Sequence, residues 1–369
     1  SRLRAKAGLT RERADRFVLW GDLVTYLLGG EAVTSQSLAS RTLLLDTRAG
    51  DWSEALLEAT GIPRRMLPLV RASGTLAGEV SDGMAARLGL PRGVAMVVGG
   101  HDQCCNALGA GIVRAGRAVC GIGTFECITP VYERIPAAAT LLAHGLNVEH
   151  HVLPGLFVSF LYNQSGSLVR WFRDTFAAAD RQHLAAGEDL YDRLAAEMPA
   201  GPSRLLVLPY FEMTGPPGFV ADAAGAIVGL RTDTTRGEIL KAIMESTTFY
   251  FAECLPALGA LGITATEYVA TGGGARSDAW LQIKADVFGV PFLRPRHADG
   301  SVLGAAMLAG LATGALDNPA AAAGAWVRIE RVFEPDPARH ARYRERLAAY
   351  RELFPRLHPL LRSPAPPVR

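Results

Sequence analysis

The residue of this sequence whose type and place best suit chemistry is Asp102. It follows the run VAMVVGG (94–100), a nearly continuous apolar stretch that ends in two glycines and is typical of a buried central strand. A carboxylate at the carboxyl end of such a strand faces the usual ligand crevice of an α/β sheet, where it could accept a proton from a substrate hydroxyl. Gln103, beside it, could hydrogen-bond a polyol. Judged by its position alone, Asp102 could equally be a residue that caps the helix predicted at 102–111. The alternative for Gln103 is a solvated helix residue.

Three glycine-rich turns each follow an apolar strand: 99–100, 121–124 and 272–274. Glycine lets backbone N–H groups approach an anion closely, and a helix that begins at the turn adds a favourable partial charge. Repeated use of this arrangement suggests a polyphosphate ligand. The alternative is that the glycines only make tight turns.

Several other kinds of site are disfavoured. No GxxxxGK[ST] motif occurs, which disfavours a P-loop kinase. Ser277 occupies the position where a dinucleotide-binding fingerprint needs its last glycine, so an oxidoreductase is only a distant alternative. Cys104 and Cys105 are adjacent and point to different sides of a helix, and His150-His151 lacks zinc spacing, so we predict no metal-ligating residues. The five cysteines form no CxxC pair, which indicates a reducing, cytoplasmic location.

Composition limits the partners and the number of domains. Lys and Arg number 38 against 36 Asp and Glu, a net charge of +2 that argues against a nucleic-acid binder. The uncharged run 302–316 is shorter than the roughly 20 apolar residues of a membrane-spanning helix, so we expect no membrane partner. At roughly 150 residues per domain, 369 residues suggest two domains.

Strands alternate with helices along the chain, which indicates α/β layers. Ser53 can cap the helix predicted at 52–60, and Gly61-Ile62-Pro63 can end it. Thr235 and Glu238 fit a capping box, Pro256 marks an end or kink, and Trp171 and Trp280 are expected to be core residues. The predicted strands are 94–100, 118–123, 152–161, 204–211 and the start of 268–289. The predicted helices are 12–29, 52–60, 102–111, 166–176, 236–255, the end of 268–289, 302–314 and 337–354.

Taken together, the segments resemble the FGGY carbohydrate kinases, relatives of glycerol kinase and xylulokinase. The resemblance starts from GGHDQCCNALGAG (99–111) and GIGTFE (121–126), and its motifs occur in the family's order over nearly the whole chain. Each motif alone is modest, but the ordered set is highly specific. The other matching segments are 40–68, 164–174, 209–217, 225–230, 270–292, 299–314 and 332–355.

This resemblance implies an α/β fold of the actin-like ATPase (ribonuclease H-like) type, with two domains around a deep cleft. Residues 1–114 would be the remaining part of the first, sugar-binding domain, 115–357 the second, nucleotide-binding domain, and 358–369 a Pro-rich tail. The implied cofactors are ATP and Mg²⁺, the implied substrate is a small sugar or polyol, and a homodimer is a common assembly of the family.

The resemblance also implies a role for individual residues. Asp102 matches the general base that takes the proton of the sugar hydroxyl, and Gln103 and His101 match substrate-binding positions. The positions that match nucleotide-binding residues are Gly123, Thr124, Gly166, Arg170, Gly273, Gly274, Ala275 and Asp278.

One part of the family pattern has no counterpart in this sequence. The family begins with a strand that carries an Asp-x-Gly-Thr-type phosphate loop, followed by sugar-contacting residues, so we expect an incomplete first domain with an exposed sheet edge and apolar faces. The chain as given should bind nucleotide weakly and should not turn over sugar. A non-catalytic, nucleotide-binding sensor or interaction protein is the alternative function, although such a protein would need neither Asp102 nor Gln103.

Overall fold

The computed structural model describes residues 14–361 except 186, 223 and 298, and the described chain divides into two compact units. The first unit comprises the chain up to Val113 together with Val148–Val158 and Ser301–Ala325. The second comprises Arg114–Asn147, Ser159–Gly300 and the chain from Trp326 onward. The first residues of the helix predicted at 12–29, and most of the tail predicted at 358–369, lie outside the described residues.

The strands of the first unit are two to four residues long and pair in short ladders. One ladder is parallel, β1 (Val33–Ser35) with β4 (Leu69–Arg71). The antiparallel ladders are β2 (Leu45–Asp46) with β3 (Asp51–Trp52), β5 (Leu76–Glu79) with β6 (Ala95–Val97), and β9 (Glu149–His150) with β10 (Phe157–Val158).

The prediction of a central strand over 94–100 is wrong. Strand β6 covers only Ala95–Val97 and pairs with β5 in a two-stranded ladder. Ala95 is exposed while Met96 and Val98 join a buried cluster with Val33. Only one face of this strand is therefore buried. A continuous apolar run in the sequence does not show whether one face or both faces of a strand are buried.

Helices connect these ladders. The helices are α2 (Trp20–Leu27), α3 (Gln36–Ser40), α4 (Glu54–Thr60), η1 (Arg64–Met66), α5 (Asp82–Leu88), α6 (Asp102–Gly109), α13 (Gly300–Ala312) and α14 (Pro319–Trp326). Helix α4 has the predicted signals: the Ser53 hydroxyl accepts from the Leu56 N–H, and Gly61 ends the helix in the left-handed conformation at φ 63°. Helix α2 begins later than predicted, because the Phe17 N–H donates to the Met66 carbonyl at 2.7 Å instead of a helical bond.

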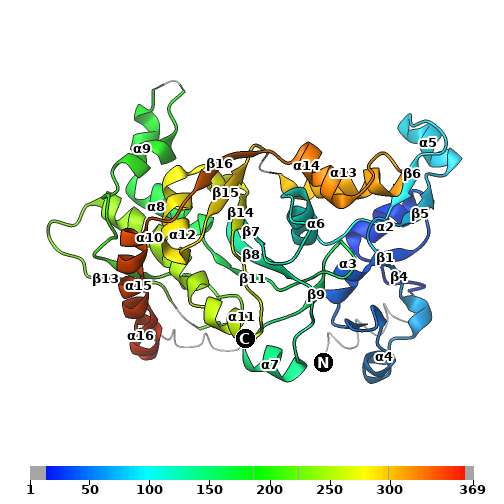
Figure 1. Cartoon of the computed structure of the whole chain (residues 1–369), viewed down its shortest axis with the longest axis horizontal. Coiled ribbons are helices and arrows are strands. Elements are labelled where there is room, and N and C mark those ends of the chain that lie inside the picture. Colours follow the sequence, from blue (N-terminus) through cyan, green and yellow to red (C-terminus); the bar gives the residue numbers. More distant parts are fainter. Residues whose placement is uncertain (1–13, 186, 223, 298, 362–369) are drawn as a thin grey trace. The chain divides into compact units, whose positions relative to one another are not determined.

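The second unit is built on a sheet in the order β16-β15-β14-β7-β8, with β11 on the other side of β8 (Figure 1). Strand β14 runs parallel to both of its neighbours, and its four residues are all buried, as expected for a covered parallel strand. The bounds are β7 (Ala118–Ile122), β8 (Phe125–Tyr132), β11 (Leu161–Gln164), β14 (Tyr268–Thr271), β15 (Phe292–Pro295) and β16 (Ile329–Phe333); β12 (Leu206–Leu208) and β13 (Ala226–Val228) form a separate pair.

Four predicted helices occur in the second unit, at 166–176, 236–252, 278–288 and 337–351, and its other helices were not predicted. The helices of this unit are α7 (Ala138–Ala143), α8 (Gly166–Phe176), η2 (Asp180–His183), α9 (Leu190–Ala196), α10 (Arg236–Ala252), α11 (Leu255–Ala260), η3 (Gly273–Arg276), α12 (Asp278–Phe288), α15 (Pro337–Arg351) and α16 (Leu353–Leu361). The capping box of Thr235 and Glu238 is present, and Pro256 lies in the first turn of a new helix, which confirms the predicted break. Trp280 is buried as predicted, but Trp171 is 36% exposed and packs edge-on against Phe211 at the surface, so that prediction is wrong.

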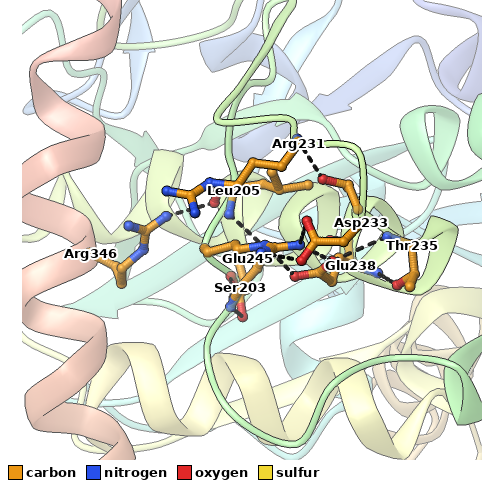
Figure 2. A network of polar contacts seen from close by, with 10 residues as sticks. Ser203, Leu205, Arg231, Asp233, Thr235, Glu238, Glu245 and Arg346 are labelled. Carbon is orange, nitrogen blue, oxygen red and sulfur yellow. Dashed lines mark hydrogen bonds and ion pairs between the residues drawn. The ribbon is translucent and has the colours of Figure 1, made fainter.

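A polar network fastens the segment before β12 to helices α10 and α15 (Figure 2). The Ser203 N–H donates to both carboxylate oxygens of Glu245 at 3.1 Å. The Arg346 guanidinium donates to the Leu205 carbonyl at 2.7 Å. Burial raises the pKa of Glu245 to about 7, although the bonds from Ser203 and Tyr343 oppose that shift.

Candidate active site

Asp102 is the first residue of helix α6, and its carboxylate lies at the surface of the first unit. The side chain is 70% exposed, and its Oδ1 accepts from the Gln103 N–H at 2.8 Å. The N-cap position belongs to His101, which makes no side-chain capping bond. The carboxylate therefore remains accessible to a ligand, and capping does not account for its position.

His101 places its imidazole beside that carboxylate. Its Nε2 lies 3.3 Å from Asp102 Oδ1, and the side chain is mostly buried. Burial lowers the pKa of His101, the charge of Arg41 lowers it further, and Asp102 opposes both, so the ring is neutral near pH 7. The Arg41 guanidinium is itself paired with the buried Glu149 at 2.5 Å.

Gln103 carries an amide oxygen without a hydrogen-bond partner among the described residues. This Oε1 is buried, and most buried polar side-chain atoms in proteins are paired with protein or water. The orphaned acceptor is therefore suited to a hydroxyl donor.

Close backbone contacts hold helix α6 in place. A Cβ on Gly304 of α13 would lie 1.9 Å from the Cys105 carbonyl oxygen, and a Cβ on Gly100 would lie 2.3 Å from Val152 Cγ1. The Ser301 hydroxyl donates to the Asp102 carbonyl at 3.1 Å. This support of Asp102 by α13 was not predicted from the sequence. The small residues of 300–312, which allow close helix packing, were the available indication.

In the second unit, the turn between β7 and β8 meets the start of α8. The Gly166 N–H donates to the Gly123 carbonyl at 3.1 Å, and a Cβ at Gly166 would lie 2.2 Å from that oxygen, so only glycine fits. The Arg170 guanidinium donates to the Thr124 hydroxyl at 3.4 Å. Four predicted site residues from two segments thus lie together.

The triple-glycine segment packs on the same end of β7. Gly272 has φ +83°, and a Cβ there would lie 2.7 Å from the Ile122 carbonyl oxygen. A Cβ on Gly274 would lie 2.3 Å from Ile122 Cγ2. Gly273, Gly274 and Ala275 lie in the short helix η3 (Gly273–Arg276), next to the turn that carries Gly123.

A cavity of about 570 Å³ lies at the carboxyl ends of the parallel strands β14 and β15, where α/β proteins bind ligands. Ala275 lines it, whereas Gly273, Gly274 and Asp278 are not lining residues. The Asp278 carboxylate is held by Arg294 at 2.6 Å and by Arg331. The complete lining is Ala270, Gly272, Ala275, Arg276, Arg294, Pro295, Arg296, His297, Asp299 and Glu330.

The basic lining residues were missed by the sequence analysis. Arg294, Arg296 and His297 lie at the end of strand β15, and this group of basic residue types after a strand was the available signal. No group of three or more His, Cys, Asp or Glu side chains that could hold a metal ion occurs among the described residues. Over the same residues, none of the helices has the length and apolar character required to cross a membrane.

Comparison with known protein families defines the class. The C-terminal domain model of the FGGY family of carbohydrate kinases matches residues 129–313, and the N-terminal domain model matches residues 3–109. The chain therefore belongs to the FGGY family of carbohydrate kinases and has its actin-like ATPase fold.

Individual relatives agree with this class. The chain is 28% identical to the xylulose kinase of Staphylococcus epidermidis, over 93% of this chain and 67% of the relative. It is 31% identical to the autoinducer-2 kinase of Escherichia coli K12, over 90% of this chain and 64% of the relative. The chain thus spans about two thirds of the length of these relatives.

Solved structures show the same architecture. The xylulose kinase of Rhodospirillum rubrum aligns with a TM-score of 0.79 at 28% identity, over 92% of this chain and 67% of that protein. The glycerol kinase of Plasmodium falciparum with ADP aligns with a TM-score of 0.76 at 20% identity, over 90% of this chain and 65% of that protein, a likeness of fold alone.

Proposed function

We propose that the protein that contains this chain carries out the ATP-dependent phosphorylation of a sugar or polyol hydroxyl, with Asp102 as the general base. The observation that carries the proposal is the exposed Asp102 carboxylate on the first residue of α6, in a chain of this family. The unpaired Gln103 amide oxygen beside it supports a substrate that donates hydroxyl hydrogen bonds.

In the proposed reaction, Asp102 takes the proton of the acceptor hydroxyl. The oxygen then bonds to the γ-phosphorus of ATP, the bond from that phosphorus to the β–γ bridging oxygen breaks, and ADP leaves. Gln103 and neutral His101 orient the acceptor. A positioned base contributes roughly 10²–10⁴-fold to such a rate.

We assign nucleotide binding to the second unit. Thr124 and Arg170 place a hydroxyl and a cation at the β7–β8 turn, and the N-terminus of α8 adds its dipole, which suits phosphate. Gly273, Gly274, Ala275 and Asp278 would border the adenosine, next to the cavity at the ends of β14 and β15.

We include Mg²⁺ in this proposal only because the chain belongs to the FGGY family. The described residues provide no cluster of ligands, so they do not fit a metal site built from protein side chains, and we derive no step through the ion. Magnesium commonly binds with substrate phosphates and few protein ligands, so we propose that it enters with ATP.

Exposed apolar side chains on the first unit indicate a surface that a further polypeptide segment would cover. In α2 only Asp22 is buried, whereas Trp20 is 85% exposed and Leu27 is 63% exposed. A surface helix normally buries its apolar side chains and exposes its charged ones, so this pattern is the opposite of the expected one. Among the described residues, strands β1 and β4 form a parallel ladder of two strands, although parallel sheets are normally covered and extended. We propose that additional polypeptide covers this face, and that the chain alone binds nucleotide weakly and does not turn over sugar.

The same proposal includes the domain assignment. Residues 1–114 would be the remainder of the sugar-binding domain, and 115–357 would be the nucleotide-binding domain. The cytoplasmic location and the homodimer stay predictions.

The test is substrate-dependent release of ADP, measured over a panel of pentoses, hexoses and polyols with the protein as its gene encodes it. We expect at least one panel member to stimulate release, and Asp102→Ala to lower that rate by about 10²–10⁴-fold while circular dichroism stays unchanged. Binding of MgATP without stimulation of ADP release by any panel member would instead favour a nucleotide-binding sensor. An equal, non-zero rate in wild type and Asp102→Ala would contradict the role of Asp102 as the base.

A further inference from the structure

A fully buried ion pair lies behind the β7–β8 turn. The Lys284 ammonium of α12 is 2.7 Å from Glu126 Oε1, and both side chains are 0% exposed. Glu126 is on β8, two residues after Thr124. The Cys120 thiol also donates to Oε1 at 3.3 Å, and the Lys284 ammonium lies 3.4 Å from the Thr248 hydroxyl.

The other carboxylate oxygen of Glu126 reaches the start of helix α8. Its Oε2 accepts from the Ser165 hydroxyl at 2.8 Å. Ser165 is the N-cap residue of α8, is itself 0% exposed, and donates its own N–H to the Thr124 carbonyl at 3.3 Å. The Glu126 carboxylate thus connects strand β8, the N-cap residue of α8, and helix α12.

These three elements carry or adjoin several of the predicted nucleotide-binding residues. Thr124 precedes β8, Gly166 and Arg170 lie on α8, and Asp278 begins α12. Desolvation of two charges is unfavourable, and buried ion pairs are often no better for stability than apolar residues of the same size. Stability alone therefore does not account for a charged pair at this place.

We propose that the pair Glu126–Lys284, acting through Ser165, positions the β7–β8 turn and the N-terminus of α8 for the phosphates of the nucleotide. Glu126, Lys284 and Ser165 are positioning residues, since none of them is exposed to a ligand. This inference rests on the proposed function and adds the residues that determine its phosphate affinity.

The test separates phosphate binding from adenosine binding. Calorimetric titration at pH 7 would measure the affinities of MgATP and adenosine for wild type, Ser165→Ala and Glu126→Gln in the protein as its gene encodes it. We expect both variants to bind MgATP at least tenfold more weakly and adenosine within twofold of wild type. Ser165→Ala removes one hydroxyl only, so it keeps the test decisive if Glu126→Gln fails to fold.

The matched control is Glu245→Gln, which alters another buried carboxylate of the same unit that bonds to Ser203 and Tyr343. It should leave both affinities within twofold. Unchanged MgATP affinity in Ser165→Ala, or an equal loss for MgATP and adenosine, would overturn the inference. If wild type binds neither ligand, the nucleotide-binding part of the proposed function fails, and the positioning role fails with it.

Discussion

The two units place their site residues in different ways. In the second unit, glycine turns sit on buried strands of one sheet, and a buried charge pair joins the elements that carry them. In the first unit, Asp102 stands on an eight-residue helix among two-stranded ladders, and its carboxylate is exposed. The comparison indicates that the second unit positions its predicted site residues through its buried core, whereas the first unit presents Asp102 from a short helix among two-stranded ladders.

The largest effect on stability should come from breaking the buried pair on one side. Lys284→Met leaves the Glu126 carboxylate buried without its counter-charge, which should lower the free energy of unfolding by about 3–5 kcal/mol. Urea titration followed by circular dichroism measures the change. The double variant Glu126→Gln/Lys284→Met should recover most of the loss, and a single-variant loss below about 1 kcal/mol would contradict the assigned importance of the pair.

A second effect in the core of the second unit depends on pH. Burial raises the pKa of Glu245 from 4.5 to about 7, so the folded protein keeps a proton that the unfolded chain releases between those values. The contribution of this group to stability is complete below pH 4.5 and is lost as pH rises through 7, by about 3 kcal/mol. Between pH 4.5 and pH 8, the free energy of unfolding of wild type should therefore fall by about 3 kcal/mol more than that of Glu245→Gln. Identical pH dependence in the two proteins would show that Glu245 titrates normally.

A smaller effect is expected in the first unit at the contact between α13 and α6. Gly304→Ala places a methyl group against the Cys105 carbonyl, where overpacking costs about 1–3 kcal/mol. Thermal unfolding would measure the loss. Gly324→Ala is the matched control, because a Cβ there meets nothing within 4 Å, and it should be neutral or slightly stabilising. Equal effects of the two substitutions would mean that α13 does not set the position of α6.

The sequence was sufficient where the determinants are local. The caps at Ser53 and Thr235, the glycine stop at Gly61 and the strand–turn–helix pattern of 268–289 involve residues within a few positions of one another, and the structure confirms each of them. The FGGY resemblance is likewise confirmed by both family models.

Long-range partners could not be predicted from the sequence. Glu126 and Lys284 are 158 residues apart, and nothing in the pattern around either shows that they meet. Asp278 was assigned to the nucleotide, but its pairing with Arg294 and Arg331 depends on where β15 and β16 lie in the sheet. The strand at 94–100 was misjudged because apolar content does not report how many neighbours a strand has.

The most direct test of the central claim is the separation of nucleotide binding from phosphoryl transfer in Asp102→Asn, an isosteric change that removes the base. In the protein as its gene encodes it, we predict that the dissociation constant for MgATP stays within twofold of wild type. Substrate-dependent ADP release should fall by about 10²–10⁴-fold. Release within tenfold of wild type, at unchanged MgATP affinity, would contradict the assignment of Asp102 as the general base.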